Sequence, residues 1–197
     1  MTPQILDKLT TLREQRFLLP GYYSWEEFEK IEALTANAPG LRINYLDGSI
    51  EFRNHSEKHE IIKSILAILL EFYFFEININ FIPVGSATRR AKEKSASFEP
   101  DESYCIGEKK EHPDLAIEVN ITSGSLDKLE KYKRFKITEV WFWENNQLFL
   151  YGLNNDNYEQ ITQSNLLPEL DINLLVRCVL MPSIIEARTE FIKGIRQ

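Results

Sequence analysis

The order of hydrophobic and polar positions in the first third of the chain predicts a helix followed by a hairpin. Residues 24–27 (Ser-Trp-Glu-Glu) form a capping box, and apolar side chains recur at helical spacing over 28–34. Two short β-prone segments, 41–46 and 49–52, flank the Asp-Gly pair at 47–48. Asp-Gly is a strong signal of a two-residue turn, so we expect an antiparallel hairpin here.

A second, longer helix is expected after Asn54, which can cap it with Glu57 in the reciprocal position. One face of this helix is apolar and should pack on a core; its positions are Ile61, Ile62, Ile65, Leu66, Leu69 and Tyr73. The segment 77–84 then predicts a strand that ends at Gly85, and 103–106 predicts another short strand.

The centre of the chain alternates strand, helix and strand. Residues 115–119 are nearly all apolar, as in a strand that is buried on both faces. Residues 126–135 have a helical pattern, and 140–143 predict a second buried strand with which 148–151 would pair. A strand–helix–strand unit over 114–143 implies a right-handed crossover and a parallel pair of strands.

Together these elements predict an α/β fold with a mixed central β-sheet flanked by α-helices. The tail after Leu170 has a helical pattern that is broken near Pro182. No repeat, low-complexity tract or linker rich in Gly, Ser or Pro divides the sequence, so we expect residues 1–197 to form a single domain.

The composition narrows the functional classes. The chain has 197 residues, a net charge of −7 and a pI near 5.1, so it lacks the overall basic character of many nucleic-acid-binding proteins. Residues 88–136 carry a net charge of +1, which fits either a locally positive groove or a solvated face of mixed charge. No apolar segment is long enough to cross a membrane, and Cys105 and Cys178 form no disulfide framework, so we expect a cytoplasmic protein with reduced thiols.

Glu118 is the most unusual residue, because it interrupts an apolar segment in an expected central strand. A buried carboxylate is costly unless it is paired, hydrogen-bonded or bound to a cation. Asp101 comes 17 positions earlier, directly before another strand. Adjacent strands lie about 4.8 Å apart, which suits two oxygen ligands of one hard cation such as Mg²⁺. The alternative is that Glu118 pairs with a neighbouring helix and that Asp101 is a turn residue.

Two lysines and a further glutamate can complete such a site. Lys128 lies ten positions after Glu118 on the following helix, and Lys131 shares its face one turn later. Either ammonium group could orient a metal-bound water or stabilise charge on a phosphate, and both suit a solvated helix face equally well. Glu60, next to His59 at the start of the second helix, could bring an acid to the same metal; the alternative is that both are exposed first-turn residues.

The candidate residues belong to a longer series of short motifs. The series contains Pro-Asp at 100–101, Glu118-Val119 at the end of an apolar strand, Lys128-Leu129 with Tyr132 four positions on, and Glu139-Val140-Trp141. Segments 24–28, 45–48, 59–60 and 98–104 precede these motifs. In order and spacing, residues 22–175 resemble the Uma-two family, which comprises restriction-endonuclease-like proteins of cyanobacterial type within the PD-(D/E)XK nuclease superfamily.

The resemblance implies a restriction-endonuclease-like core that hydrolyses DNA phosphodiester bonds. Asp101 and Glu118 would hold Mg²⁺ (or Mn²⁺), with Glu60 as a further ligand, and the metal would activate water for attack on phosphorus. In the parent superfamily a catalytic lysine stands two residues after the glutamate, where this chain has asparagine. The family places that lysine on the next helix, which matches Lys128, with Lys131 as the other candidate.

Two alternatives to catalysis stay open. The acidic balance and the missing strand lysine also suit a non-catalytic DNA-binding or interaction protein on a nuclease scaffold, because a fold does not imply its function. The central acids can also form a salt-bridged core within a homodimer, with strands over 140–151 and the apolar tail supplying the interface.

Overall fold

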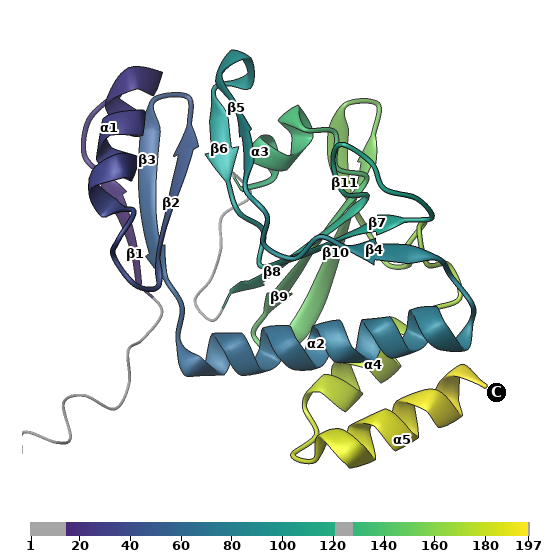
Figure 1. The fold of residues 1–197 in the computed structure, drawn as a ribbon. Coiled ribbons are helices and arrows are strands. Elements are labelled where there is room, and N and C mark those ends of the chain that lie inside the picture. Colours follow the sequence, from purple (N-terminus) through teal and green to yellow (C-terminus); the bar gives the residue numbers. More distant parts are fainter. Residues whose placement is uncertain (1–14, 121–127, 197) are drawn as a thin grey trace, which may run out of the picture.

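The computed structural model describes residues 15–120 and 128–196, which form two β-sheets and five α-helices (Figure 1). The helices are α1 (Trp25–Thr35), α2 (Glu57–Glu76), α3 (Lys128–Arg134), α4 (Ile172–Val179) and α5 (Ile184–Ile195). The strands of the first sheet are β1 (Gln15–Leu19), β2 (Leu41–Leu46), β3 (Ser49–Asn54), β5 (Arg89–Ala91) and β6 (Ala96–Phe98). Those of the second are β4 (Phe81–Pro83), β7 (Glu102–Ile106), β8 (Leu115–Asn120), β9 (Glu139–Glu144), β10 (Gln147–Asn154) and β11 (Asn157–Ile161).

The first sheet is built around the predicted hairpin and has the strand order β1-β3-β2-β6-β5, with antiparallel pairing. The hairpin of β2 and β3 is confirmed: Asp47 and Gly48 at its turn both have positive φ, as this type of turn requires. Helix α1 begins with the predicted capping box at Ser24 and packs two buried aromatic side chains, Trp25 and Phe28, against the hairpin.

The second sheet is mixed and has the strand order β11-β10-β9-β8-β7-β4. Strands β8 and β9 pair in parallel and α3 lies between them in the chain, which confirms the predicted strand–helix–strand unit. One face of the sheet packs on α2, α4 and α5, and the other packs on α3. Strand β8 is therefore buried along its whole length, as its apolar sequence predicts.

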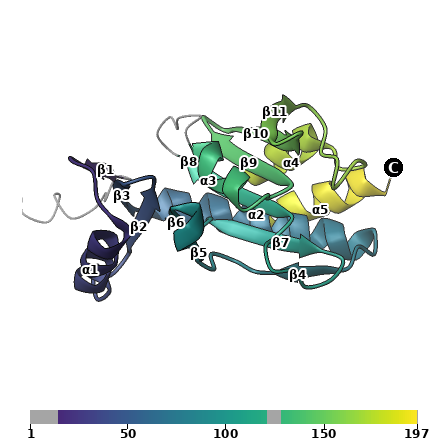
Figure 2. The same ribbon diagram turned by 90° about the horizontal axis from the view of Figure 1, so that it is seen from above.

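The predicted α/β class is confirmed, but the strands do not join in one central sheet. Figures 1 and 2 show the hairpin sheet with α1 set beside the larger sheet, while α2 runs along the larger sheet from the side of the hairpin. The chain passes from β6 of one sheet to β7 of the other through Pro100. Proline cannot donate a hydrogen bond to a strand ladder, so it separates the two pairings.

Helix α2 differs from its prediction at the N-terminus, and the strand that follows it is shorter than predicted. Its N-cap is Ser56, whereas the expected cap, Asn54, is the last residue of β3. The helix continues to Glu76 and β4 begins only at Phe81, so the predicted strand over 77–84 is too long. The cause is a turn directly after the helix: Ile77 is its C-cap, Asn78 has a positive φ, and the Ile79 amide donates back to the Phe74 carbonyl at 2.9 Å.

The C-terminal tail forms α4 and α5, and the predicted break near Pro182 is confirmed. Both helices pack on α2 and extend the main core. Among the described helices, none combines the length and the apolar character that a membrane span requires.

Glu139, at the start of β9, is a fully buried carboxylate whose partners are neutral. It accepts hydrogen bonds from Trp141 Nε1 at 2.9 Å, from Ser164 Oγ at 2.7 Å, and from the amides of Asn165 at 2.6 Å and Leu166 at 3.0 Å. These bonds fasten the segment after β11 to the sheet. A buried carboxylate with this many donors has a structural role that needs no counter-ion.

We predict that Glu139→Gln lowers the free energy of unfolding by about 2–3 kcal/mol, because the amide can accept at only one of the two oxygen positions and leaves buried donors unsatisfied. Urea unfolding followed by circular dichroism measures the change. Glu159→Gln, at an exposed position of the edge strand β11, is the matched control and should shift the value by no more than about 0.5 kcal/mol. An equal loss in both variants would contradict the structural role of Glu139.

Candidate active site

Asp101 lies directly before β7 and is fixed by the backbone of β8. The antiparallel register pairs Glu102 with Ile117, so Asp101 comes next in line beside Glu118. Its Oδ2 atom accepts a hydrogen bond from the amide of Val119 at 2.7 Å, and its own amide donates to the Ile117 carbonyl at 3.1 Å. The two carboxylates singled out in the sequence thus lie on adjacent strands.

Glu118 lies on the face of β8 that packs against α3, and its side chain is fully buried. Its Oε1 atom accepts hydrogen bonds from Lys131 Nζ at 2.9 Å and from the Tyr132 hydroxyl. Its Oε2 atom accepts from Arg53 Nη1 at 2.9 Å. Lys131 and Arg53 are also buried, so charges of both signs are removed from water together.

Two arginines of the hairpin reach across from the first sheet to the carboxylates of the second. Besides its bond to Glu118, Arg53 on β3 places Nη2 at 4.0 Å from Asp101 Oδ2. Arg42 on β2 donates from Nη1 to Asp101 Oδ1 at 3.1 Å. Arg42 and Arg53 are direct cross-strand partners, so a like-charged pair faces a pair of carboxylates.

The neighbouring charges keep Asp101 ionised. Burial and the charge of Glu118 act to raise the pKa of Asp101, but the hydrogen bond from His59 and the charge of Arg53 outweigh them and hold it below its usual value. Burial lowers the pKa of Lys131 despite the attraction of Glu118. Burial raises the pKa of Tyr132 well above its usual value, so this hydroxyl remains a hydrogen-bond donor.

Two stacked histidines join Asp101 to Glu60. His59 Nε2 lies 2.9 Å from Asp101 Oδ2 and His55 Nε2 lies 3.5 Å from Oδ1, while the Nδ1 atom of each ring lies 3.3 Å from Glu60 Oε1. The rings stack with centroids 3.8 Å apart. Burial lowers the pKa of His55 to about 4, against the opposing effect of the Asp101 charge, so this imidazole is neutral at neutral pH.

These positions decide between two interpretations of the start of α2. The alternative in which His59 and Glu60 are both exposed is wrong for His59, which is fully buried, and Glu60 is of intermediate burial, with 47% of its side chain exposed. The imidazoles lie between Glu60 and Asp101, because each ring has one nitrogen close to each carboxylate. Glu60 therefore approaches the histidines rather than the carboxylate pair.

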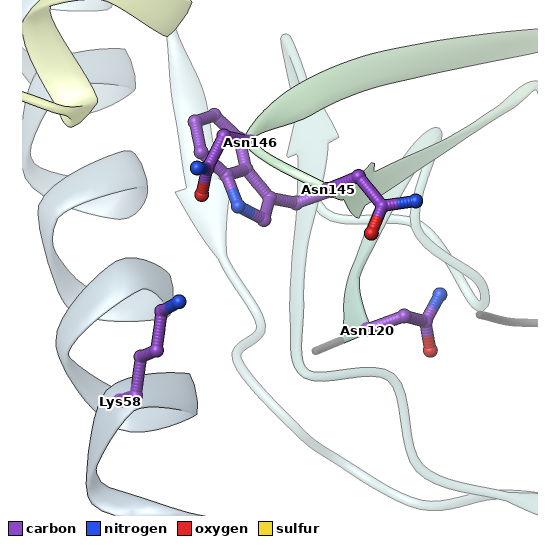
Figure 3. Close-up of a pocket in the computed structure, with 5 residues that line it drawn as sticks. Lys58, Asn120, Asn145 and Asn146 are labelled. Atoms are coloured by element: carbon purple, nitrogen blue, oxygen red, sulfur yellow. The ribbon is translucent and has the colours of Figure 1, made fainter. Parts of the chain in front are cut away.

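A polar cavity of about 270 Å³ opens at the carboxyl ends of β8 and β9. It is lined by Lys58, Asn120, Trp143, Asn145 and Asn146 (Figure 3). Lys58 reaches in from α2, while Asn145 and Asn146 come from the turn between β9 and β10. Sequence reasoning did not identify this cavity, since nothing local shows which side chains line it.

Of the two candidate lysines, Lys131 and Lys128, the structure describes the side chain of Lys131 alone. Lys131 contacts Glu118, as described above. Lys128 is the first residue of α3, but its side chain lies outside the described residues, as does the 121–127 segment before it.

Sequence reasoning did not identify Arg42 and Arg53 as part of the site. The sequence did contain a signal: the Asp-Gly turn fixes the register of the hairpin, and this register places the two arginines directly opposite each other. Two like charges in such positions are unfavourable unless an acidic group lies nearby.

We predict that Lys131→Met lowers the free energy of unfolding by about 3 kcal/mol, because it removes one cation from a buried carboxylate. In combination with Glu118→Gln the loss should fall short of the sum of the two single losses by at least about 1 kcal/mol, since the double variant removes both charges of the Lys131–Glu118 pair. Urea unfolding of both single variants and the double variant measures this coupling. Lys193→Met, on the exposed face of α5, is the control, and strictly additive losses would contradict a buried Lys131–Glu118 pair.

Comparison with known proteins places the chain in a family. The chain matches none of the curated proteins with which it was compared. Residues 25–180 match the model of the Uma2 (Uma-two) family, whose description is "Putative restriction endonuclease". The matched region contains the hairpin arginines, both histidines of the stacked pair, Asp101, Glu118 and Lys131. With most of its length covered by this model and an α/β fold consistent with a restriction-endonuclease-like core, the chain belongs to the Uma2 family of restriction-endonuclease-like proteins.

Proposed function

We propose that this protein is a metal-dependent endonuclease that hydrolyses phosphodiester bonds in DNA. The observation that carries the proposal is the pair of buried carboxylates, Asp101 and Glu118, which adjacent strands hold side by side within a ring of cations. Membership of the Uma2 family supports a nuclease-like role. A buried acidic pair is costly to maintain, so its presence favours a site of chemistry.

The carboxylate pair fits a divalent metal such as Mg²⁺ or Mn²⁺ in donor type. Both ions prefer carboxylate oxygens, and Mg²⁺ is usually held by one or two carboxylates together with water or substrate oxygens. Asp101 Oδ1 and Glu118 Oε2 accept bonds from Arg42 and Arg53, long side chains that can give way to another cation. We assign these two acids as the ligands and leave Glu60 to the histidines.

The metal, when bound, would activate water for attack on phosphorus. Arg42 and Arg53, which lie at the same acids, could stabilise the negative charge that develops on the phosphate oxygens. Lys131 is the ammonium that contacts Glu118, and its lowered pKa favours proton donation to the ester oxygen whose bond to phosphorus breaks. Lys128 is the second candidate for this role.

The cavity beside the site suits the backbone of a nucleic acid. Lys58 offers a charge for a phosphate, and the amide groups of Asn145 and Asn146 offer donors and acceptors. Such contacts position a duplex without reading its sequence. DNA is thus the proposed substrate, although the chain as a whole is acidic.

One observation favours a second candidate function. The oxygens of Asp101 and Glu118 already have cationic partners from the chain itself, namely Arg42, Arg53 and Lys131. If the arginines hold their places against a divalent metal, the protein binds DNA on a nuclease scaffold without cleaving it.

We predict that the wild-type protein nicks supercoiled plasmid in the presence of Mg²⁺ or Mn²⁺ and that EDTA abolishes the activity. Asp101→Asn and Glu118→Gln should each lower the rate at least about 100-fold, since each removes a charged ligand of the metal. Glu159→Gln, far along the edge strand β11, should keep the wild-type rate. Agarose gel electrophoresis of the plasmid forms gives the rates, and circular dichroism establishes that each variant is folded.

The same assay separates the two lysines and the two functions. Loss of nicking in Lys131→Met with activity kept in Lys128→Met assigns the role to Lys131, and the reverse assigns it to Lys128. Salt-dependent DNA binding by the wild type without cleavage in any metal would contradict the endonuclease and support the binding protein.

We predict that Lys58→Gln weakens DNA binding to the same extent for unrelated duplex sequences. Loss of one phosphate contact should reduce the slope of log affinity against log salt concentration by about 1. Fluorescence anisotropy with two labelled duplexes at several salt concentrations measures both effects. Lys193→Gln is the matched control, because α5 packs near the opposite end of α2, where Arg196 pairs with Glu76; an equal effect there would contradict a role for the cavity.

A further inference from the structure

We propose that Arg16 binds a phosphate of the nucleic-acid backbone beside the carboxylate pair. The inference deepens the proposed function, on which it rests in taking DNA as the substrate. The observation that carries it is a row of three arginines across the first sheet. Two of them face an acid, whereas the third, Arg16, faces a neutral amide.

The register of three neighbouring strands sets this row. Arg16 of β1 lies directly opposite Arg53 of β3, which in turn lies directly opposite Arg42 of β2. Directly opposite residues of antiparallel strands point to the same face of a sheet, so the three guanidinium groups share one face. Like charges in such positions destabilise the sheet, so each arginine needs a negative partner.

The partners on the second sheet differ along the row. Arg42 and Arg53 donate to the two acids of the site, as described above. Arg16 Nη2 instead donates to Asn120 Oδ1 at 3.0 Å. Asn120 follows Glu118 by two positions on β8, so the two side chains point to the same face of that strand. The row of arginines therefore meets two acids and then an amide.

The amide of Asn120 gives Arg16 a hydrogen bond but no negative charge. Its Nδ2 atom donates to Glu144 Oε1 at 2.9 Å, which turns the amide oxygen toward Arg16. Among the described residues, the carboxylate that pairs with Arg16 is Glu51, at 3.9 Å from Nη1, and 30% of that side chain is exposed. An ion pair this long and this open to water contributes little. Arg16 is therefore the arginine of the row whose charge is least neutralised.

Arg16 is also accessible to a ligand. The exposed fraction of its side chain is 19%, against 1% for Arg53. Its Nε atom is buried and has no hydrogen-bond partner among the described residues. A guanidinium carries five N–H donors in a planar fork that matches two oxygens of one phosphate. Arg16 thus has both donors and charge available for an anion.

Asn120 connects Arg16 to the polar cavity as well as to the carboxylate pair. It lies two positions after Glu118 and also lines the cavity, as does Lys58 of α2 (Figure 3). A DNA strand that lies in the cavity and reaches the acids therefore passes Asn120 and the guanidinium bonded to it. The phosphate that Arg16 binds is then a contact in addition to that of Lys58.

Fluorescence anisotropy of a labelled DNA duplex in EDTA, at several salt concentrations, tests the site apart from cleavage. Arg16→Gln should weaken binding about 10-fold or more and reduce the slope of log affinity against log salt concentration by about 1. Arg16→Lys keeps the charge and should keep the wild-type slope. The matched control is Arg177→Gln, which removes an exposed arginine of α4, away from β1 in Figures 1 and 2, and it should change neither quantity.

Glu51→Gln is a variant with the opposite expected sign. It removes the acid that pairs with Arg16, and its amide oxygen can still accept from Asn44 Nδ2. DNA binding should become tighter, whereas Glu159→Gln on the edge strand β11 should leave it unchanged. A role for Arg16 that is only structural predicts an unchanged salt slope in Arg16→Gln and no gain in Glu51→Gln.

Wild-type affinity and slope in Arg16→Gln would overturn the inference, and so would a wild type that does not bind DNA. If Arg16→Gln fails to fold, the absence of tighter binding in Glu51→Gln overturns it. Plasmid nicking separates the two proposals. Nicking by the wild type with undiminished binding in Arg16→Gln overturns the phosphate site alone. Binding that depends on Arg16, without nicking in any metal, overturns the endonuclease alone.

Discussion

The buried ion pair between Arg53 and Glu118 is the contact on which the relative position of the two sheets depends. Arg53 belongs to the hairpin of the first sheet and Glu118 to the central strand of the second, and both side chains are shielded from water. Either charge alone would cost several kcal/mol in this position, so separation of the sheets is opposed by desolvated charge as well as by lost apolar contact. The hairpin therefore has to lie where its arginines meet Asp101, directly before β7, and Glu118 of β8.

Glu118 and Glu139 show how partners decide what a buried carboxylate does. Both are fully buried in the second sheet. Glu139 accepts hydrogen bonds from an indole, a hydroxyl and two backbone amides. All four donors are neutral, so none of them is a cation that a metal ion could replace. Glu118 instead faces Arg53 and Lys131, whose charges can be exchanged for other charges. The proposed function therefore places the chemistry at Glu118, whereas the contacts of Glu139 are structural although its burial is the same.

Local signals in the sequence predicted the elements but not the network that joins them. The capping box, the Asp-Gly turn and the apolar strand each concern neighbouring residues, so they could be recognised without the fold. The partners of the acids are 59 and 65 positions away along the chain, and only the docking of two sheets brings them together. The position of Asp101 beside Glu118 could be predicted, because adjacent strands have a fixed spacing. The burial of His59 could not, because no sequence pattern indicates it.

The proposed function would link the chemistry of the site to the stability of the fold. A divalent ion bound by Asp101 and Glu118 would compete with Arg42 and Arg53, whose ion pairs with these acids also hold the hairpin sheet. The metal would then have to supply as much stabilisation as the lost ion pairs, and the two arginines would need another anion. A phosphate of a DNA substrate would be such an anion, so metal and substrate would stabilise the site together more than either does alone.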